Sequence, residues 1–325
     1  MDLELLRERA AVIRNVRAFF DRLGYLETDT PLMAPDLIPE SCLEVFEISR
    51  LLPGRAGQKR PYWLIPSPEI WMKRLIASHR VSMYQICKCF RNGESAGRFH
   101  SPEFTMLEYY TMNAGYRDSL DITRELFAAL MEHCAEPGFS GDIETVTIAE
   151  AFSRWAGFDL YAAAEREGGL EAEARRLGLD PMPGLGTPEI YDLIFIHTVE
   201  PKLPKDRLVA LTDYPAFTPC MARKNPEGKT VQRWELYGRG VELANCYSEE
   251  TDPYEVRKFF ETEAAEKERS ALVRHAVDPG YWKNFLPLRG EPFPQCSGVA
   301  MGLDRLIMVL TGRKTIDGVL PFPMD

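Results

Sequence analysis

The sequence lacks the features that define several large classes of protein. Its 325 residues contain no apolar run approaching the roughly 18 residues of a membrane span, so we expect no membrane association. Its seven cysteines include no CxxC pair, which argues against a zinc finger or a disulfide framework and favours a reducing compartment. Neither GxGxxG nor a P-loop motif stands between an early strand and a helix, so both nucleotide-binding folds are excluded.

The net charge of the chain and its first ten residues limit which binding partners and which cellular compartment we expect. The net charge of -10 would repel a phosphate backbone over most of the surface, which disfavours a tRNA partner but leaves room for a local basic groove. The first ten residues, MDLELLRERA, carry acids and no apolar stretch after a basic start, so they predict neither a signal nor a transit peptide. We therefore expect a cytoplasmic protein.

The pattern along the chain favours an α+β fold on an antiparallel sheet flanked by helices. Apolar residues at helical spacing predict a first helix that Gly24 ends, and "SPE" predicts a helix with Ser67 as its N-cap. Residues 81–91 and 103–112 predict a long hairpin. The helical pattern over about 117–205 predicts an insertion within one domain that spans residues 1–325.

The stretch "FRNGESAGRFHSPEFTMLEYY" combines cations and aromatic residues in that hairpin. Arg91, Arg98 and His100 are suited to hold a polyphosphate, and Phe104 offers a flat face to a purine. Taken alone, the hairpin fits equally well a surface whose charges are merely solvated. In "SGVAMGLDRLIMVL", two glycines permit close approach of a ligand, and Arg305 begins a helix whose N-terminus favours anions. This second segment favours the phosphate-binding interpretation.

Three ordered segments resemble motifs 1, 2 and 3 of the class II aminoacyl-tRNA synthetases: the helix before Pro31, the "FRN…RFHSPEF" hairpin and "GVAMGLDRL". The strings "SPEIWMKRL", "HSPEFTMLEYY" and "GVELANCYSEETD" resemble the lysyl branch of that family. The resemblance covers nearly the whole chain. It implies a class II catalytic core, a homodimer built through motif 1, and ATP and Mg²⁺ as cofactors.

The resemblance also assigns roles to residues around ATP. It implies that Arg91 binds the α-phosphate, that Arg98 and His100 bind the outer phosphates, and that Arg305 covers the face of adenine opposite Phe104. Arg91 and Arg305 are thus the expected catalytic residues. The expected ATP-binding set is Arg91, Asn92, Gly93, Arg98, His100, Ser101, Phe104, Glu242, Leu243, Gly302 and Arg305. Compared with the family pattern, the loop after Asn92 is one residue longer, and Gly93 stands in place of a glutamate whose role Glu94 would take in a shifted register.

A predicted hairpin in "RWELYGRGVELAN" brings two carboxylates together. With Gly238 and Arg239 as its two-residue turn, Glu235 lies directly across from Glu242. Like charges in that arrangement destabilise a sheet, so a cation should lie between them. The resemblance assigns both positions to magnesium, and the alternative is that both carboxylates point to solvent.

The amino-acid pocket is expected to be anionic. Glu69, Glu242 and Glu249 suit a substrate with two ammonium groups, although Glu242 shares a strand face with the others only if the strand bulges or ends after Ala244. The expected substrate-binding residues are Ser67, Pro68, Glu69, Tyr110, Glu242, Asn245, Glu249 and Ala300. The pocket therefore indicates lysine or a close relative.

The motif 1 helix starts near Met1, so we expect no anticodon-binding OB domain before it. In lacking this domain, the chain resembles the short lysyl-tRNA synthetase paralogs that ligate (R)-β-lysine to elongation factor P. Ala300, where lysyl-tRNA synthetases usually have glycine, fits the same paralogs. The resemblance implies ATP-dependent activation of (R)-β-lysine, or lysine, and its ligation to a lysine of elongation factor P. Two alternatives stay open: an enzyme that charges tRNA or another acceptor with α-lysine, and a catalytically silent amino-acid sensor or regulatory protein.

Overall fold

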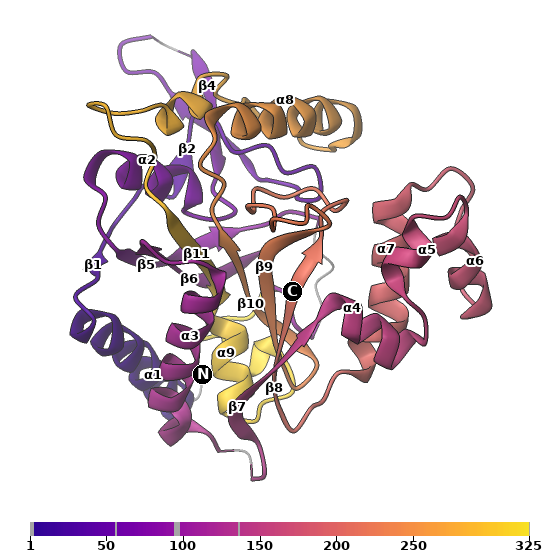
Figure 1. Cartoon of the computed structure of the whole chain (residues 1–325). Coiled ribbons are helices and arrows are strands. Elements are labelled where there is room, and N and C mark those ends of the chain that lie inside the picture. The colour runs from indigo at the N-terminus through magenta and orange to yellow at the C-terminus, as the bar shows by residue number, and fades with distance from the viewer. Residues whose placement is uncertain (1–2, 56, 94–97, 136, 325) are drawn as a thin grey trace.

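The computed structural model describes residues 3–55, 57–93, 98–135 and 137–324, and an eight-stranded sheet lies at its centre (Figure 1). In order across the sheet, the strands are β1 (Leu26–Glu27), β5 (Met83–Phe90), β6 (Glu103–Met112), β11 (Cys296–Gly302), β10 (Val241–Ser248), β9 (Thr230–Gly238), β8 (Arg207–Pro215) and β7 (Ser140–Thr147). The pairings from β5 to β8 are antiparallel, and only the edge pairs β1–β5 and β7–β8 are parallel. The predicted α+β class and the predicted β5–β6 hairpin are confirmed.

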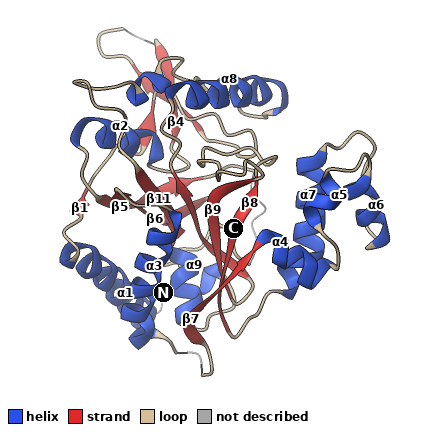
Figure 2. Cartoon of the chain, viewed as in Figure 1, coloured by secondary structure: helices blue, strands red, loops and turns tan. Residues whose placement is uncertain are grey.

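The helices surround this sheet (Figure 2). The main body carries α1 (Leu3–Arg22), α2 (Glu69–His79), α3 (Tyr116–Leu130), α8 (Pro253–Ser270) and α9 (Leu303–Leu310). The insertion carries α4 (Ile148–Ala151), α5 (Leu160–Ala164), α6 (Gly169–Arg176) and α7 (Thr187–Ile194). None of the helices in the described ranges is long and apolar enough to cross a membrane.

The two faces of the sheet differ in chemistry. Successive side chains of a strand point to opposite faces, so on β6 Leu107 and Tyr109 enter the core while Glu108 and Tyr110 face the other way. Helices α1, α3 and α9 cover the apolar face and form one hydrophobic core with it. The opposite face carries polar side chains, and it is the face on which the candidate site lies.

Helix α1 is fixed on the apolar face by an apolar stripe and a buried ion pair. Its buried residues Val12, Val16 and Phe19 follow helical spacing, and Gly24, at φ 77°, lies just beyond the end of the helix as predicted. The Nη1 atom of Arg9 lies 2.5 Å from Oδ1 of Asp304 in α9. The first helix is therefore joined directly to the helix that follows β11.

A small second sheet and two helices cover part of the polar face. The sheet has the order β2 (Met33–Ala34), β4 (Lys59–Leu64) and β3 (Glu47–Leu51). Trp63 of β4, Ile76 of α2 and Phe260 of α8 share a hydrophobic cluster with Tyr110 of the main sheet. Helix α2 begins at Glu69 with Pro68 as its N-cap, one residue later than predicted, and the Ser67 hydroxyl accepts a hydrogen bond from Glu69 N at 3.3 Å.

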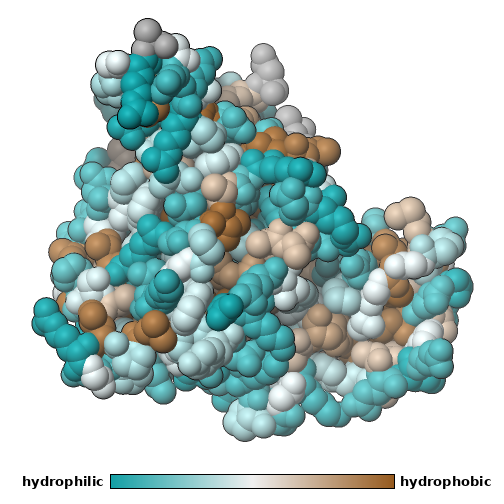
Figure 3. All heavy atoms as spheres, turned by 90° about the horizontal axis from the view of Figure 1, so that it is seen from above, coloured by the Kyte–Doolittle hydropathy of each residue, from teal (hydrophilic) through white to brown (hydrophobic). Residues whose placement is uncertain are grey.

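The predicted start of the helical insertion near residue 117 was wrong. Helix α3 contributes Leu120 and Phe127 to the main core, and β7 pairs with β8 through Thr147 and Thr212. An amphipathic helix has the same pattern whether it packs on a sheet or in an insertion, so the sequence does not separate the two. The insertion begins at Ile148 and lies beside the main body (Figure 1), and its buried residues share one hydrophobic cluster with Val209 and Leu211 of β8. On the face seen in Figure 3, hydrophobic residues form small groups among hydrophilic ones.

Candidate active site

Four strands align one row of side chains across the polar face. Glu108 of β6 pairs with Ala300 of β11, Ala300 pairs with Asn245 of β10, and Asn245 pairs with Glu235 of β9. Residues two positions along each strand form a parallel row on the same face. The strand pairing thereby brings three predicted site residues, Ala300, Asn245 and Glu235, side by side with Glu108.

The β9–β10 hairpin differs from the predicted register. Arg239 and Gly240 form the turn, with φ of 54° and 79°, which is the signature of a type I′ turn. Tyr237 therefore lies opposite Glu242, and Glu235 lies opposite Asn245. The predicted direct pairing of Glu235 with Glu242 was wrong because the turn lies one residue later than expected.

A β-bulge after Glu242 places the carboxylates on one face despite that register. The pairing shifts between Glu242 and Ala244, which leaves Leu243 as the extra residue. The extra residue inverts the alternation, so Glu242 and Asn245 point to the same side of the sheet as Glu235. The anionic pocket required a bulge or a strand end after Ala244, and the bulge is present one residue earlier, at Leu243.

A cavity of about 450 Å³ opens on this face and joins the second and third predicted motifs. Its walls come from the β5–β6 hairpin, from β9 and β10, and from β11 with the start of α9. The predicted site residues that line it are Arg91, His100, Ser101, Phe104, Glu235, Glu242, Leu243, Asn245, Ala300, Gly302 and Arg305. The predicted residues outside this lining are Ser67, Pro68, Glu69, Asn92, Gly93, Arg98, Tyr110 and Glu249.

The two predicted catalytic arginines are held at the cavity wall. The Arg91 guanidinium lies over the Phe104 ring, with its carbon 5.2 Å from the ring centroid. The Nε atom of Arg305 donates to the carbonyl of Phe99 and Nη1 donates to the carbonyl of Glu242, both at 3.0 Å. The backbone therefore orients Arg305, and its Nη1 also lies 4.0 Å from Oε2 of Glu242 at the cavity wall.

Three predicted ATP-binding residues support the loops around the cavity. Asn92 N donates to the carbonyl of Glu44 at 2.9 Å, and the Asn92 side chain donates to the carbonyl of Val45 at 3.3 Å. Gly93 has a φ of 69°, which favours glycine, and Arg98 donates to the carbonyl of Lys314 at 3.4 Å. Glu94, considered as a substitute for the usual glutamate, lies outside the described residues.

The carboxylates near the phosphate side have unequal surroundings. Oε2 of Glu235 accepts hydrogen bonds from Tyr214 at 2.6 Å and Tyr237 at 2.7 Å, and its other oxygen pairs with Arg233. Burial raises the pKa of Glu242 to about 7, and repulsion from Glu235 adds to that shift. Glu242 is thus the carboxylate in this pair that gains most from a cation in the cavity. No trio of His, Cys, Asp and Glu side chains in the described ranges is arranged to hold a metal ion.

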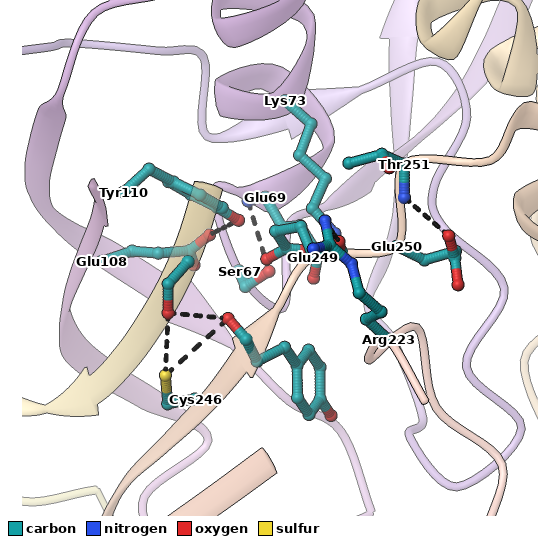
Figure 4. A network of polar contacts seen from close by, with 12 residues as sticks. Ser67, Glu69, Lys73, Glu108, Tyr110, Arg223, Cys246, Glu249, Glu250 and Thr251 are labelled. Carbon is teal, nitrogen blue, oxygen red and sulfur yellow. Dashed lines mark hydrogen bonds and ion pairs between the residues drawn. The ribbon is translucent and has the colours of Figure 1, made fainter. Parts of the chain in front are cut away.

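A buried lysine joins two of the predicted substrate-binding carboxylates (Figure 4). The Nζ atom of Lys73 lies 2.5 Å from Oε1 of Glu69 and 2.7 Å from Oε2 of Glu249, and the Lys73 side chain is 1% exposed. Attraction to Glu249 and Glu69 raises the pKa of Lys73 well above its usual value despite burial, so it stays charged. The predicted anionic pocket therefore contains its own cation.

Glu108 and Tyr110 complete this buried network beside the sheet. The Tyr110 hydroxyl donates to Oε1 of Glu108 at 2.7 Å. Burial, followed by repulsion from Glu69, raises the pKa of Glu108 well above its usual value, so its neutral form is favoured. A Cβ on Gly298 would lie 2.5 Å from both Oε1 of Glu249 and Cε1 of Tyr110, so glycine makes the room that these two side chains occupy.

Lys73 and Glu40 are site residues that the sequence reasoning missed. Lys73 follows Glu69 by four positions, which is the spacing of a helical ion pair and the signal that could have found it. Glu40 lies in the loop between β2 and β3 and lines the cavity. No local pattern marks Glu40, because it reaches the cavity only through the folded path of that loop.

The long hairpin, the closing helix with its arginine and the cavity between them define a class II synthetase catalytic core. The chain belongs to this family: the model for "tRNA synthetases class II (D, K and N)" matches residues 3–325. An elongation factor P–(R)-β-lysine ligase of Avibacterium paragallinarum is 33% identical over 324 residues, covering 99% of this chain and 96% of the relative. Proteins with the same name from Vibrio vulnificus (strain YJ016) and Proteus mirabilis (strain HI4320) are 34% and 33% identical, covering 99% and 98% of this chain and 96% and 94% of the relatives.

Proposed function

We propose that this chain is an ATP-dependent ligase that activates (R)-β-lysine, or lysine, as an aminoacyl-adenylate and transfers it to a lysine of elongation factor P. The similarity to ligases of that name runs along nearly the whole chain. The observation that carries the proposal is that Arg91, Arg305 and Glu242 line one cavity. The buried carboxylates of Glu69 and Glu249, which pair with Lys73, lie beside it.

The cavity walls fit a triphosphate and a purine. Arg91 and Arg305 supply guanidinium groups, which form strong charge-assisted bonds to phosphate oxygens. A Cβ on Gly302 would lie 3.8 Å from Cδ of Arg305, so glycine at this position leaves the cavity wall beside the Arg305 side chain clear. The buried Ser101 hydroxyl has no hydrogen-bond partner among the described residues, so it is a donor available to ATP. Phe104 is the proposed surface for adenine.

Glu242 is the residue best suited to hold Mg²⁺ beside the phosphates, with Glu235 as its neighbour. Hard cations prefer oxygen ligands, and Mg²⁺ is commonly bound by one or two carboxylates together with substrate phosphates. The oxygens of Glu235 already receive three donors, from Tyr214, Tyr237 and Arg233, so its role is closer to orienting the site. When bound, Mg²⁺ would neutralise charge on the leaving pyrophosphate.

The proposed chemistry has two steps. An oxygen of the substrate carboxylate attacks the α-phosphorus, the bond to the β-phosphate oxygen breaks, and pyrophosphate leaves with that electron pair. Arg91 would stabilise the charge that spreads over the α-phosphate. The ε-amine of the acceptor lysine then attacks the acyl carbon, AMP leaves, and the amine loses a proton to form an amide. No side chain has to act as a covalent nucleophile.

Assembly and location are part of the same proposal. Leu26 and Met33, in the segments that follow α1, are 55% and 46% exposed, and the resemblance places the dimer contact of motif 1 in this region. We expect a homodimer in the cytoplasm, and light scattering of the purified protein tests the mass directly. A monomeric mass at micromolar concentration would refute the dimer.

Pyrophosphate exchange into ATP tests the first step. Exchange that depends on (R)-β-lysine or lysine, followed by transfer to elongation factor P rather than tRNA, is the expected result. Arg91→Ala should lower exchange about 100-fold or more. Exchange with no lysine isomer would favour an amino-acid sensor, efficient charging of tRNA would favour a tRNA-aminoacylating enzyme, and near-normal exchange by Arg91→Ala would refute the role of that residue.

A further inference from the structure

Glu40 is a cavity carboxylate without an assigned role. It lies on the loop between β2 and β3, and its side chain lines the cavity. Among the described residues, no hydrogen bond or ion pair to its carboxylate is formed, whereas its backbone carbonyl accepts a hydrogen bond from Lys267 Nζ at 3.0 Å. The next residue, Ser41, donates from N and Oγ to Oε2 of Glu263 at 3.0 and 2.8 Å. Helix α8 thus fixes the loop and leaves the carboxylate for a ligand.

The charges around Glu40 place it between the two halves of the site. Burial raises its pKa to about 7, and repulsion from Glu69 adds to the shift. Arg91 opposes the shift most strongly, followed by Lys267 and Lys73. Glu40 therefore interacts electrostatically with Glu69, on the amino-acid side, and with Arg91, on the side where the substrate carboxylate would meet ATP.

A charge count shows what the amino-acid side lacks. A lysine isomer brings two ammonium groups, and each needs a carboxylate in a site of low dielectric. When both are ionised, Glu69 and Glu249 carry two negative charges, but Lys73 neutralises one of them. Burial raises the pKa of Glu108 and so opposes its charged form, and Glu242 is proposed to hold Mg²⁺, so neither is counted for the substrate. These residues together compensate one ammonium group and leave the second without a counter-charge.

We propose that Glu40 supplies this missing carboxylate and binds the substrate ammonium group nearest the carboxyl end, which is the β-ammonium of (R)-β-lysine. This proposal rests on the proposed function and names a specificity residue for it. Because Glu40 acts at the reacting end, a shift of the amine by one carbon changes its distance to this carboxylate. Glu40 then helps to discriminate α-lysine from β-lysine.

Substrate analogues that lack one amine each provide the test. (R)-3-Aminohexanoate keeps the amine near the carboxyl end, and 6-aminohexanoate keeps only the distal amine. Glu40→Gln should lower kcat/KM for (R)-β-lysine and (R)-3-aminohexanoate by about 10- to 100-fold, mainly through KM, because a charged hydrogen bond is lost. The same variant should change the value for 6-aminohexanoate by less than about threefold. Glu40→Asp should recover part of the loss.

The matched control is Glu47→Gln, the same change at an exposed position of β3. It should leave all three substrates unaffected. An equal loss by Glu40→Gln on 6-aminohexanoate would mean that Glu40 only supports the loop, and no loss on (R)-β-lysine would mean that it does not touch the substrate. Either result overturns the proposal.

A binding measurement separates this proposal from the proposed function. (R)-β-Lysine should raise the melting temperature of the wild-type protein, and Glu40→Gln should lose most of that shift. If the wild type catalyses no exchange but shows binding that depends on Glu40, the proposed function fails and the role of Glu40 stands. If (R)-β-lysine binds both proteins equally, the role of Glu40 is refuted whatever the catalytic result.

Discussion

Replacing Lys73 by methionine should destabilise the protein far more than the loss of an ordinary surface ion pair. Lys73 is 1% exposed and lies within 2.7 Å of carboxylate oxygens of both Glu69 and Glu249. Methionine keeps most of the side-chain volume but leaves two buried carboxylates without a cation. Breaking a buried pair in this way costs about 3 to 5 kcal/mol. With about 2 to 3 °C per kcal/mol for a chain of this length, the melting temperature should fall by about 6 to 15 °C.

The matched control is Lys88→Met, which removes an exposed pair. Nζ of Lys88 lies 3.2 Å from Glu103, and the two side chains are 40% and 32% exposed. Such a pair contributes about 0 to 1 kcal/mol, so the melting temperature should fall by no more than about 3 °C. Thermal unfolding monitored by circular dichroism measures both variants. Equal small losses for Lys73→Met and Lys88→Met would refute the buried network as described.

The pH dependence of Lys73→Met gives a second check on the same reasoning. Burial already raises the pKa of Glu249 to about 7 in the presence of Lys73, and the loss of the cation raises it further above the unfolded value. An acid whose folded pKa is raised contributes stability at low pH and loses it as the pH rises through that pKa. The gap in melting temperature between variant and wild type should therefore widen from about pH 5.5 to about pH 8. A gap that narrows would contradict the assignment.

Three further predictions concern the cavity and its support. Gly298→Ala places a Cβ 2.5 Å from Oε1 of Glu249, so KM for (R)-β-lysine should rise at least about tenfold, and unchanged kinetics would contradict the packing. Burial raises the pKa of Glu40 and of Glu249 to about 7, and an ammonium group binds a carboxylate in its ionised form. KM for (R)-β-lysine should therefore fall about tenfold for each of these groups between about pH 6 and about pH 8. A KM that does not change with pH would refute this expectation. Arg9→Met leaves Asp304 buried without its cation, so urea denaturation should show a loss of about 3 to 5 kcal/mol, and a loss under about 1 kcal/mol would show that the pair is dispensable.

The parts of the fold that sequence reasoning predicted are those with a local periodic signal. The first helix and the long β5–β6 hairpin have that signal over many residues, so both were predicted near their observed bounds. The hairpin turn of β9 and β10 was misplaced because Arg239 adopts φ 54°, a conformation that few residues other than glycine favour. Glycine at 238 was the more obvious turn residue, and the shift of one residue changed every predicted cross-strand partner.

The site was predicted best where residue type alone indicates chemistry. Arginines with aromatic residues indicated phosphate and purine binding, and the structure brings Arg91, Phe104 and Arg305 to one cavity. Lys73 was missed because a lysine inside a helix is usually a solvated residue, and its second partner, Glu249, comes from a distant strand end. The electrostatics of the pocket therefore follow from tertiary contacts that no local window contains.

Strand β10 explains how one segment can serve both halves of the site. Before the bulge at Leu243, Glu242 points to the cavity beside Arg305. After the bulge, Asn245 continues on the same face, and the chain leads to Glu249 and its contact with Lys73. In a regular strand of the same length, Glu242 and Asn245, three positions apart, would face opposite sides of the sheet, and the phosphate side would lose its carboxylate or the amino-acid side its amide. The bulge at Leu243 is therefore what keeps both side chains on one face, so that the proposed nucleotide and amino-acid sides meet over one strand.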